Sequence, residues 1–316
     1  AELGAISMAP EKTRRELELD RVWGLSREGE VDGIAWATHV VLGGATLISE
    51  NPSIAYPLLH NCRLIDRCVR SNKPVSLLGA GASNIRTKRA KRLLKRHYEA
   101  HLDVIAVRSI HDKQQASEAG GIQADVIQVA ADAAFAMPIP PDFCRPPQGV
   151  VGVNLVGEHG TSDVFIDRVR DALRTFFRTE ANCCPVGICS ETRREVGFDY
   201  ALTSDVVRSI APEAEVWCDY LSCDAFLESL NRCEFVVTMR MHVLLFCGLL
   251  GIPCLAIARE QKTESMLREL GLPVELDLDS SCEEMAQALQ RIRESPSAYI
   301  PSREHVAQLH ERALRN

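Results

Sequence analysis

Residues 236–262 read VVTMRMHVLLFCGLLGIPCLAIAREQK, an almost wholly apolar run with basic residues near both ends. Residues 235–238 have the continuous apolar pattern of a strand that is buried on both faces. Residues 243–250 suit a helix that Gly251 ends, and residues 254–258 suit a second buried strand. A strand, a helix and a strand in this order predict one βαβ unit with two parallel strands.

The basic residues of this run follow the two predicted strands. Arg240 and His242 come after the first strand, and Lys262 comes after the second. Because the carboxyl ends of parallel strands meet at one edge of the sheet, where open α/β sheets bind ligands, we expect the three side chains to converge there. The N–H groups at the start of the intervening helix would add positive potential. The pattern therefore predicts an anion site, for a phosphate together with a carboxylate.

Each of these residues also has an ordinary structural explanation. An Arg or a Lys just after a strand is commonly a solvated loop residue, and a His at the start of an apolar helix is commonly a cap or a core residue. The set of three favours an anion site more than any one member does, because a core turn seldom needs both Arg240 and His242.

Short apolar strands alternate with helical segments along the chain, which is typical of parallel sheets covered by helices. Further strands are expected at residues 38–44, 74–81, 103–108, 125–132, 150–155, 184–190 and 215–219. Helical patterns occur near residues 54–71, 86–98, 111–119, 163–178, 199–210 and 222–231, and twice more after residue 282. A proline-rich loop at residues 137–149 interrupts the alternation. The prediction is an α/β protein with two Rossmann-like domains, residues 1–146 and 147–316, that face each other across a cleft.

Arg108 is a second candidate for binding an anion. It ends the strand at residues 103–108, directly before a predicted helix, and so it also lies at a carboxyl edge. An ion pair with Asp132, at the end of a neighbouring strand, is the structural alternative for this arginine.

Two glycine turns follow predicted strands of the first half and would let a ligand approach the backbone. They read VLGGATL (41–47) and LLGAGASN (77–84), and their candidate binding residues are Gly43, Gly44, Gly79 and Gly81. Tight turns without a ligand explain them equally well. Neither turn matches a dinucleotide fingerprint, so we expect no NAD.

Composition limits the function classes. The net charge of −7 and the pI near 5.8 disfavour a nucleic-acid partner or an anionic lipid surface. No uninterrupted run of about 18 apolar residues predicts a membrane span, and the first residues lack the pattern of a secretory signal. The 12 cysteines show no zinc-site spacing and suit reduced thiols in the cytoplasm. We expect neither a metal nor a cofactor.

Five segments carry a resemblance to a known family: VVLGGATLI (40–48), VSLLGAGAS (75–83), LDVIAVRSIHDKQQASEAGGI (102–122), VIQVAADAAFAMP (126–138) and FVVTMRMHVLLFCGLLGIPCLAIAREQKTESMLRELGL (235–272). On these segments the sequence resembles the polysaccharide pyruvyl transferases. The last segment is the most specific, with its Arg-x-His, its Gly-x-Pro and the following Lys. Members of the family transfer the enolpyruvyl carbons of phosphoenolpyruvate onto two hydroxyls of a sugar, as a cyclic ketal, and release phosphate.

The resemblance implies two Rossmann-like domains of the GT-B type, phosphoenolpyruvate as the donor substrate, and a sugar, glycan or glycolipid as the acceptor. The donor-binding and catalytic residues of the family fall on Arg108, His242 and Lys262, and Arg240 is the Arg of the Arg-x-His pair. The chemistry of these groups suits His242 as a general acid and Lys262 as the partner of the leaving phosphate. The two arginines would hold the anionic groups of the donor. Asp132 is a candidate base for the sugar hydroxyls, although such an Asp commonly caps the next turn.

The sequence departs from the family pattern at three places. The usual glycine triplet reads Gly43, Gly44, Ala45, and the Asp that commonly follows the arginine of its strand is Ser109. The opening strand and glycine-rich loop of the family are expected to be absent, because the chain begins with AELGAISMAPEKT.

Two other functions compete with pyruvyl transfer. A glycosyltransferase of the GT-B type would use the same edge of the sheet for the diphosphate of a nucleotide sugar. A catalytically silent member of the family would bind a glycan or a protein partner, and the complete set of Arg, His and Lys argues against it.

Overall fold

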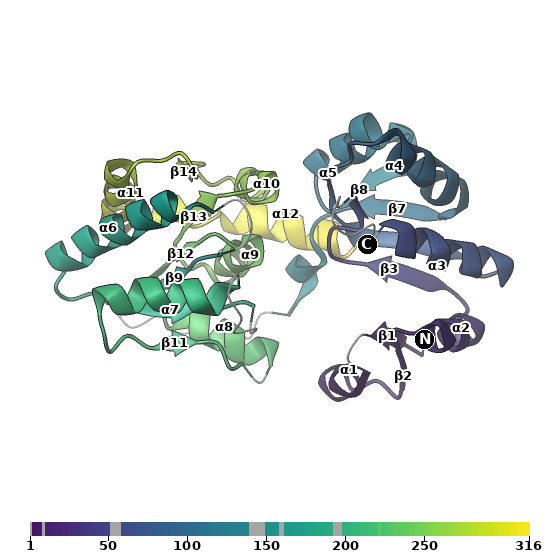
Figure 1. Ribbon diagram of the computed structural model, residues 1–316, viewed down its shortest axis with the longest axis horizontal. Coiled ribbons are helices and arrows are strands. Elements are labelled where there is room, and N and C mark those ends of the chain that lie inside the picture. Colours follow the sequence, from purple (N-terminus) through teal and green to yellow (C-terminus); the bar gives the residue numbers. More distant parts are fainter. Residues whose placement is uncertain are drawn as a thin grey trace. The chain divides into compact units, whose positions relative to one another are not determined.

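The computed structural model describes residues 2–7, 10–50, 58–138, 149–157, 161–191, 198–220 and 222–316. The chain divides into two compact units, which Figure 1 colours along the sequence. The first unit contains residues 1–136 and 309–316, and the second contains residues 137–308. The predicted boundary between residues 146 and 147 falls outside the described residues. The prediction assigned residues 309–316 to the second domain, whereas they belong to the first unit.

Among the described residues of the second unit, six parallel strands form one sheet, in the order β11-β10-β9-β12-β13-β14. The strands are β9 (Val150–Asn154), β10 (Cys184–Ile188), β11 (Val216–Trp217), β12 (Phe235–Thr238), β13 (Cys254–Ala258) and β14 (Leu276–Asp277). Counted along the unit, this is the Rossmann order 3-2-1-4-5-6, which reverses between β9 and β12. The strands β12 and β13 occupy the residues that the sequence predicts.

The helices of the second unit are α6 (Asp163–Thr179), α7 (Asp199–Ile210), α8 (Cys223–Asn231), α9 (Met241–Leu250), α10 (Gln261–Glu269), α11 (Cys282–Glu294) and the first part of α12 (Arg303–Ala313), with a 3₁₀ turn at Pro296–Tyr299. The helices α6, α7 and α11 share one core with the sheet, in which the rings of Phe176 and Phe235 meet edge to face at 5.8 Å. Right-handed connections place α9 and α10 on the other face, because the chain runs from β12 to β14 in the opposite direction along the sheet.

The helix α9 begins before its predicted start. It starts at Met241 rather than at residue 243, and so it includes His242. Gly251 ends it in the left-handed conformation (φ 68°), and the Gly251 N–H donates to the carbonyls of Cys247 and Gly248. The capping glycine of the prediction is therefore confirmed.

In the first unit, the described residues form a four-stranded parallel sheet and two pairs of parallel strands. The sheet has the order β3-β5-β7-β8, with β3 (Val40–Gly43), β5 (Val75–Ala80), β7 (Val104–Val107) and β8 (Ile127–Val129). The pairs are β1 (Gly4–Ser7) with β2 (Arg21–Gly24), and β4 (Ile48–Ser49) with β6 (Ala82–Ser83). All four strands of the sheet lie within predicted strands.

The helices of the first unit are α1 (Pro10–Leu17), α2 (Arg27–Trp36), α3 (Leu58–Arg70), α4 (Lys88–Leu93) and α5 (Ile110–Gln114). α4 and α5 continue into π-helical segments at Leu94–Glu99 and Gln115–Ala119, and 3₁₀ turns lie at Ala124–Val126 and Ala133–Ala136. The end of α12 also belongs to this unit. There Arg312 donates to the carbonyl of Ala130 from Nε (3.1 Å) and Nη2 (2.6 Å), which fastens the chain after β8.

The segment before residue 38 contains two strands and two helices that were not predicted from the sequence. The strands β1 and β2 have four residues each, and α1 reads PEKTRREL, so none of them gives a periodic apolar signal. The opening strand of the family was expected to be absent, and the structure has a strand at Gly4–Ser7.

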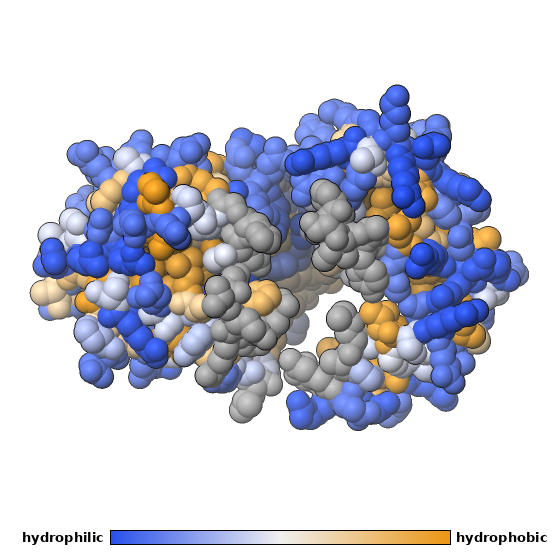
Figure 2. Space-filling model, viewed as in Figure 1, coloured by the Kyte–Doolittle hydropathy of each residue, from blue (hydrophilic) through white to orange (hydrophobic). Residues whose placement is uncertain are grey.

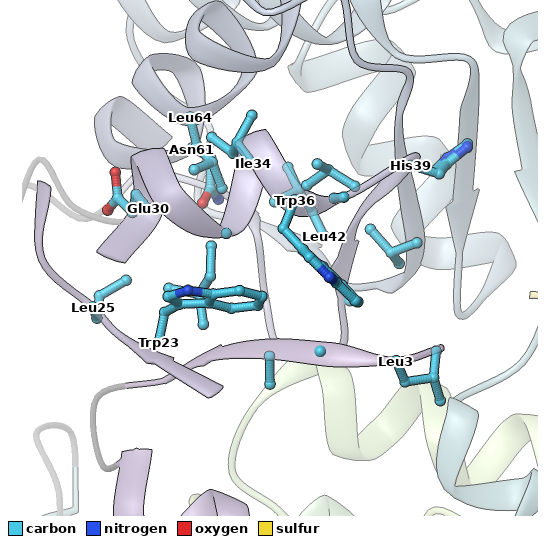
Figure 3. A pocket seen from close by; sticks show the side chains of 18 of the residues that line it. Leu3, Trp23, Leu25, Glu30, Ile34, Trp36, His39, Leu42, Asn61 and Leu64 are labelled. Atoms are coloured by element: carbon cyan, nitrogen blue, oxygen red, sulfur yellow. The ribbon is translucent and has the colours of Figure 1, made fainter. Parts of the chain in front are cut away.

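A cavity of about 500 Å³ lies between β1 and β3 of the first unit. Its lining is mostly apolar and includes Trp23, Trp36 and Leu42, and Figure 3 shows the two indole rings next to each other. Their ring centroids are 5.3 Å apart. Such a lining does not suit a phosphate or a carboxylate, because a buried anion needs charged or hydrogen-bonding partners.

The two glycine turns are joined by hydrogen bonds. The Gly81 N–H donates to the Ala45 carbonyl (2.8 Å), and the Ile48 N–H donates to the Gly81 carbonyl (3.1 Å). Gly44 (φ 66°) and Gly79 (φ 59°) adopt the left-handed conformation that glycine enters without strain. Ala45 adopts it as well (φ 51°), at the position where the family usually has a glycine. The turn therefore carries the strain of a Cβ atom in this conformation.

Hydrophilic side chains predominate on the face of the molecule that Figure 2 shows, and apolar residues are visible in scattered groups. Within the described ranges, no helix is long and apolar enough to cross a membrane.

Replacing Ala45 by glycine is expected to stabilise the first unit. Removing the Cβ atom relieves the left-handed strain, and after the entropy cost of glycine the Ala45→Gly variant should gain about 0.5–1 kcal/mol in free energy of unfolding. Chemical denaturation followed by circular dichroism measures this change. The control is Ala35→Gly, at an exposed position of α2, which should lose about 1 kcal/mol. A loss in both variants would contradict the strain at Ala45.

Candidate functional site

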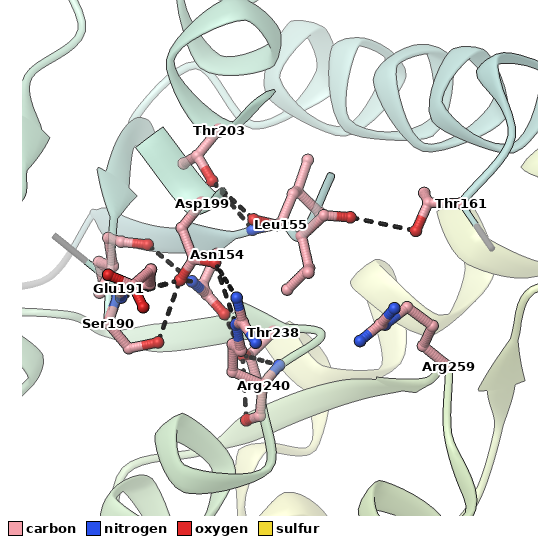
Figure 4. Close-up of polar contacts among 12 residues, drawn as sticks. Asn154, Leu155, Thr161, Ser190, Glu191, Asp199, Thr203, Thr238, Arg240 and Arg259 are labelled. Carbon is pink, nitrogen blue, oxygen red and sulfur yellow. Dashed lines mark hydrogen bonds and ion pairs between the residues drawn. The ribbon is translucent and has the colours of Figure 1, made fainter. Parts of the chain in front are cut away.

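Two polar residues stand where the strand order of the second unit reverses. Asn154 ends β9 and Thr238 ends β12, and the two residues are paired across the sheet. Both are fully buried, and the Thr238 hydroxyl donates to Asn154 Oδ1 at 2.7 Å. The same hydroxyl oxygen accepts from the Arg240 N–H at 2.9 Å, which fixes the chain as it leaves β12 (Figure 4). Ligands of open α/β sheets bind at this reversal point.

Asp199, the first residue of α7, is the centre of this edge (Figure 4). Its carboxylate is fully buried, and Oδ2 accepts from Asn154 Nδ2 (3.1 Å), Ser190 N (3.2 Å), Ser190 Oγ (3.0 Å) and Glu191 N (3.2 Å). Oδ1 accepts from Arg240 Nε (3.0 Å) and Nη2 (2.7 Å). A buried carboxylate is tolerated only with such a complete set of donors. Asp199 therefore ties the ends of β9, β10 and β12 together and fixes the orientation of the Arg240 guanidinium.

Arg240 is thus held in place rather than extended into solvent. Its side chain is 20% exposed and its charge is paired with that of Asp199. The expected role of Arg240 was a grip on the anionic groups of a donor. In the structure, Arg240 places a fixed positive charge beside the reversal point.

The end of β13 carries two cations and one carboxylate. Arg259 forms an ion pair with Glu260, and Lys262 Nζ lies 2.7 Å from Glu260 Oε2. The Arg259 side chain is 6% exposed, whereas that of Lys262 is 41% exposed. Burial alone would raise the pKa of Glu260, but the hydrogen bond and charge of Lys262, with the charges of Arg259 and Arg240, hold it below its usual value. Glu260 therefore remains ionised.

The helices after β12 and β13 begin without a side-chain cap. Their N-cap residues are Arg240 for α9 and Glu260 for α10, and neither side chain accepts from the first turn. Serines cap α6, α8 and α11. His242 is exposed at the second position of α9. Two helix N-termini of positive potential therefore lie at the same sheet edge as Arg240, Arg259 and Lys262.

Arg108 follows β7 in the first unit and is 6% exposed. Its Nη1 lies 3.5 Å from Asp132 Oδ2, and its Nε lies 3.6 Å from Asp112 Oδ2. The guanidinium rests against Gly81, where a Cβ atom would come within 2.5 Å of Nη2. The absence of a side chain at Gly81 therefore leaves the space that the Arg108 guanidinium occupies.

Ser109 and Asp112 hold the chain after Arg108. The Ser109 hydroxyl donates to Asp112 Oδ2 (2.5 Å) and accepts from the Asp112 N–H (3.0 Å), so it caps α5. Asp112 Oδ1 accepts from the Ala82 N–H at 2.7 Å, which joins α5 to the second glycine turn. The serine at this departure from the family pattern thus works as a helix cap.

Asp132 pairs with Arg108 and caps the next turn, which are the structural roles considered for it above. It is buried, it pairs with Arg108, and its Oδ1 accepts from the Ala134 N–H at 3.1 Å. Gly81, Arg108 and Asp132 therefore lie together in the first unit, with Gly43, Gly44 and Gly79 in the adjoining turns. Arg240, His242 and Lys262 belong to the second unit.

Sequence reasoning missed five charged or polar residues of these networks: Asp112, Asn154, Asp199, Arg259 and Glu260. Asn154 ends one buried apolar strand and Arg259 follows another, which is the signal that identified Arg108, so the same rule would have found them. Asp199 gives no such signal, because its partner Arg240 is 41 residues away in the sequence.

Within the part of the chain that the structure describes, no group of three or more His, Cys, Asp or Glu side chains has an arrangement that could hold a metal ion.

The Asp199–Arg240 pair predicts a large stability effect. Asp199→Asn removes the partner charge of a largely buried arginine, and we expect the free energy of unfolding of the second unit to fall by about 3 kcal/mol. Asp205→Asn on the same helix is the control, because Asp205 pairs with Arg170 at the surface and should change stability by less than about 1 kcal/mol. Chemical denaturation compares the two, and equal losses would contradict the central role of Asp199.

Solved structures of similar fold share little sequence with the chain. A protein of Listeria monocytogenes identified provisionally as UDP-N-acetylglucosamine 2-epimerase has a TM-score of 0.63 at 12% identity, covering 100% of this chain and 95% of its own. The UDP-GlcNAc 2-epimerase of Methanocaldococcus jannaschii has a TM-score of 0.61 at 10% identity (98% and 88% covered). That of Neisseria meningitidis, bound to UDP-GlcNAc, has a TM-score of 0.60 at 8% identity (96% and 86% covered). These likenesses show the fold, which is GT-B-like.

A comparison with curated proteins gave no match. The family model of polysaccharide pyruvyl transferase matches residues 5–261. The match begins within β1, includes Arg108, Arg240 and His242, and ends one residue before Lys262. With most of its length matched, the chain belongs to the polysaccharide pyruvyl transferase family.

Proposed function

We propose that this protein transfers the pyruvyl group of phosphoenolpyruvate onto two hydroxyls of a sugar, as a cyclic ketal, and releases phosphate. The family match carries the proposal, because it supports a role in pyruvyl transfer. The edge of the second unit adds support. Lys262, Arg259 and the uncapped starts of α9 and α10 offer the cations and N–H donors that a phosphate monoester needs.

The reaction adds two sugar hydroxyls to C2 of the donor. Protonation of C3 converts the CH₂ group to CH₃ and leaves positive charge at C2, which the first hydroxyl attacks as it loses its proton. The second hydroxyl then displaces phosphate from C2 and completes the ketal. One hydroxyl proton balances the proton gained at C3, and the other leaves with phosphate.

The residues of the second unit fit separate parts of this reaction. His242, exposed at the start of α9, is the proposed general acid that donates a proton to C3 or to the departing phosphate. Lys262 neutralises the phosphate as it leaves. Arg240, oriented by Asp199, supplies a positive charge that needs no reorganisation during the reaction.

Arg108 is the proposed anion-binding cation of the first unit. Its ion pairs with Asp112 and Asp132 fix its position, as Asp199 does for Arg240. We assign Asp132 to holding Arg108 rather than to deprotonating a sugar hydroxyl, because both of its oxygens already accept contacts within this network. The base for the hydroxyls is left unassigned.

Phosphoenolpyruvate is expected to raise the thermal unfolding midpoint of the wild-type protein, because a ligand at about 100 times its Kd adds about 2.7 kcal/mol to stability. Lys262→Ala should abolish the rise. His242→Ala should keep it but lose about 10²–10⁴-fold in phosphate release with a sugar acceptor. Arg268→Ala, at the far end of α10 and 69% exposed, is the control that should behave like the wild type.

The competing functions give different results in the same assay. A rise with a nucleotide sugar and none with phosphoenolpyruvate would replace the proposal with a glycosyltransferase. A rise with a glycan alone would indicate a catalytically silent binding protein.

Gly81→Ala tests the proposed role of Arg108 in the first unit. The added Cβ atom would displace the Arg108 guanidinium, and we expect phosphate release in the presence of a sugar acceptor to fall at least about tenfold while the fold is retained. In the control, Gly24→Ala, the Cβ atom has no heavy atom within 4 Å and should have no effect. Full activity of Gly81→Ala would contradict the proposed role of Arg108.

A further inference from the structure

The negative charge of Glu260 opposes the binding of an anion beside it. It lies between β13 and α10, at the same edge as the proposed donor cations, and its two carboxylate oxygens contact Arg259 and Lys262. Its side chain is 37% exposed, so it has room to turn toward solvent. A phosphate group that bound Lys262 in this arrangement would meet the Glu260 carboxylate as a like charge.

The ion pairs at this edge nearly balance in charge without a ligand. They contain three positive charges, from Arg240, Arg259 and Lys262, and two negative charges, from Asp199 and Glu260. The Asp199–Arg240 pair is built into the sheet edge and cannot separate at low cost, because the carboxylate is fully buried. The pair of Glu260 with Lys262 is the exposed one and can exchange partners.

We propose that Glu260 is a resident counter-ion of the donor site, which the phosphate group of the donor displaces from Lys262 and Arg259. The inference rests on the proposed function for the identity of the donor. It also assigns a selectivity to Glu260. A phosphate monoester carries about −1.5 to −2 charge and can replace the carboxylate, whereas a monocarboxylate of charge −1 gains little by the exchange. Glu260 thus favours phosphate-bearing anions over simple carboxylates such as pyruvate.

Titrations of the unfolding midpoint of the full chain with inorganic phosphate, phosphoenolpyruvate and pyruvate test this inference. Glu260→Gln keeps the size of the side chain and removes the competing charge. We expect the half-saturating concentrations of phosphate and phosphoenolpyruvate to fall about fivefold to tenfold, and pyruvate to become a ligand. Glu264→Gln on the same helix is the control. Glu264 forms a surface ion pair with Arg268, so this variant should match the wild type.

The outcomes separate this inference from the proposed function. Weaker or unchanged phosphate binding in Glu260→Gln would overturn it, since the carboxylate would then support Lys262 rather than compete with the ligand. The absence of any response to phosphate in both proteins would also overturn it. Tighter phosphate binding in Glu260→Gln, with phosphoenolpyruvate no better than phosphate in either protein, would support the counter-ion and contradict the donor.

Discussion

The buried ion pair of Asp199 and Arg240 constrains the second unit more than any other contact described above. A carboxylate without solvent needs every lone pair satisfied. The donors that satisfy this one come from the ends of β9 and β10 and from Arg240, the second residue after β12. These strand ends therefore have one arrangement at the point where the strand order reverses. The starts of α9 and α10, and the cations beside them, are built on that fixed edge.

The candidate residues differ in how firmly the protein holds them. Arg108 and Arg240 are largely buried, and each is fastened by carboxylates, so each presents a positive charge that does not move. His242 and Lys262 are more exposed and sit in the first turns of helices. A site that transfers a group benefits from both kinds, because fixed charges stabilise the transition state without reorganisation while exposed groups move protons and follow the leaving group.

The sequence predicted the strands of both sheets except the two-residue β14, because long apolar runs leave few alternatives. The strands β12 and β13 and the capping Gly251 follow directly from residues 235–258. The segment before residue 38 was not predicted, since four-residue strands and a charged helix carry no clear period. The candidate cations Arg108, Arg240 and Lys262 were predicted to follow strands, and they do so in the structure. Its carboxylates were missed because a partner such as Asp199 is identified only by the packing of distant strand ends.

The departures from the family pattern can be judged by what replaces the usual residue. Ser109 stands where an Asp is common, yet Asp112, three residues later, brings a carboxylate to Arg108 and accepts the Ser109 hydroxyl. In this chain the carboxylate beside the arginine therefore comes from Asp112, and Ser109 supplies the helix cap. Ala45 stands where a glycine is common, and its backbone still adopts the left-handed conformation and accepts the hydrogen bond from Gly81. Both residues therefore form hydrogen bonds close to Arg108, and Ala45 does so at a cost in local strain.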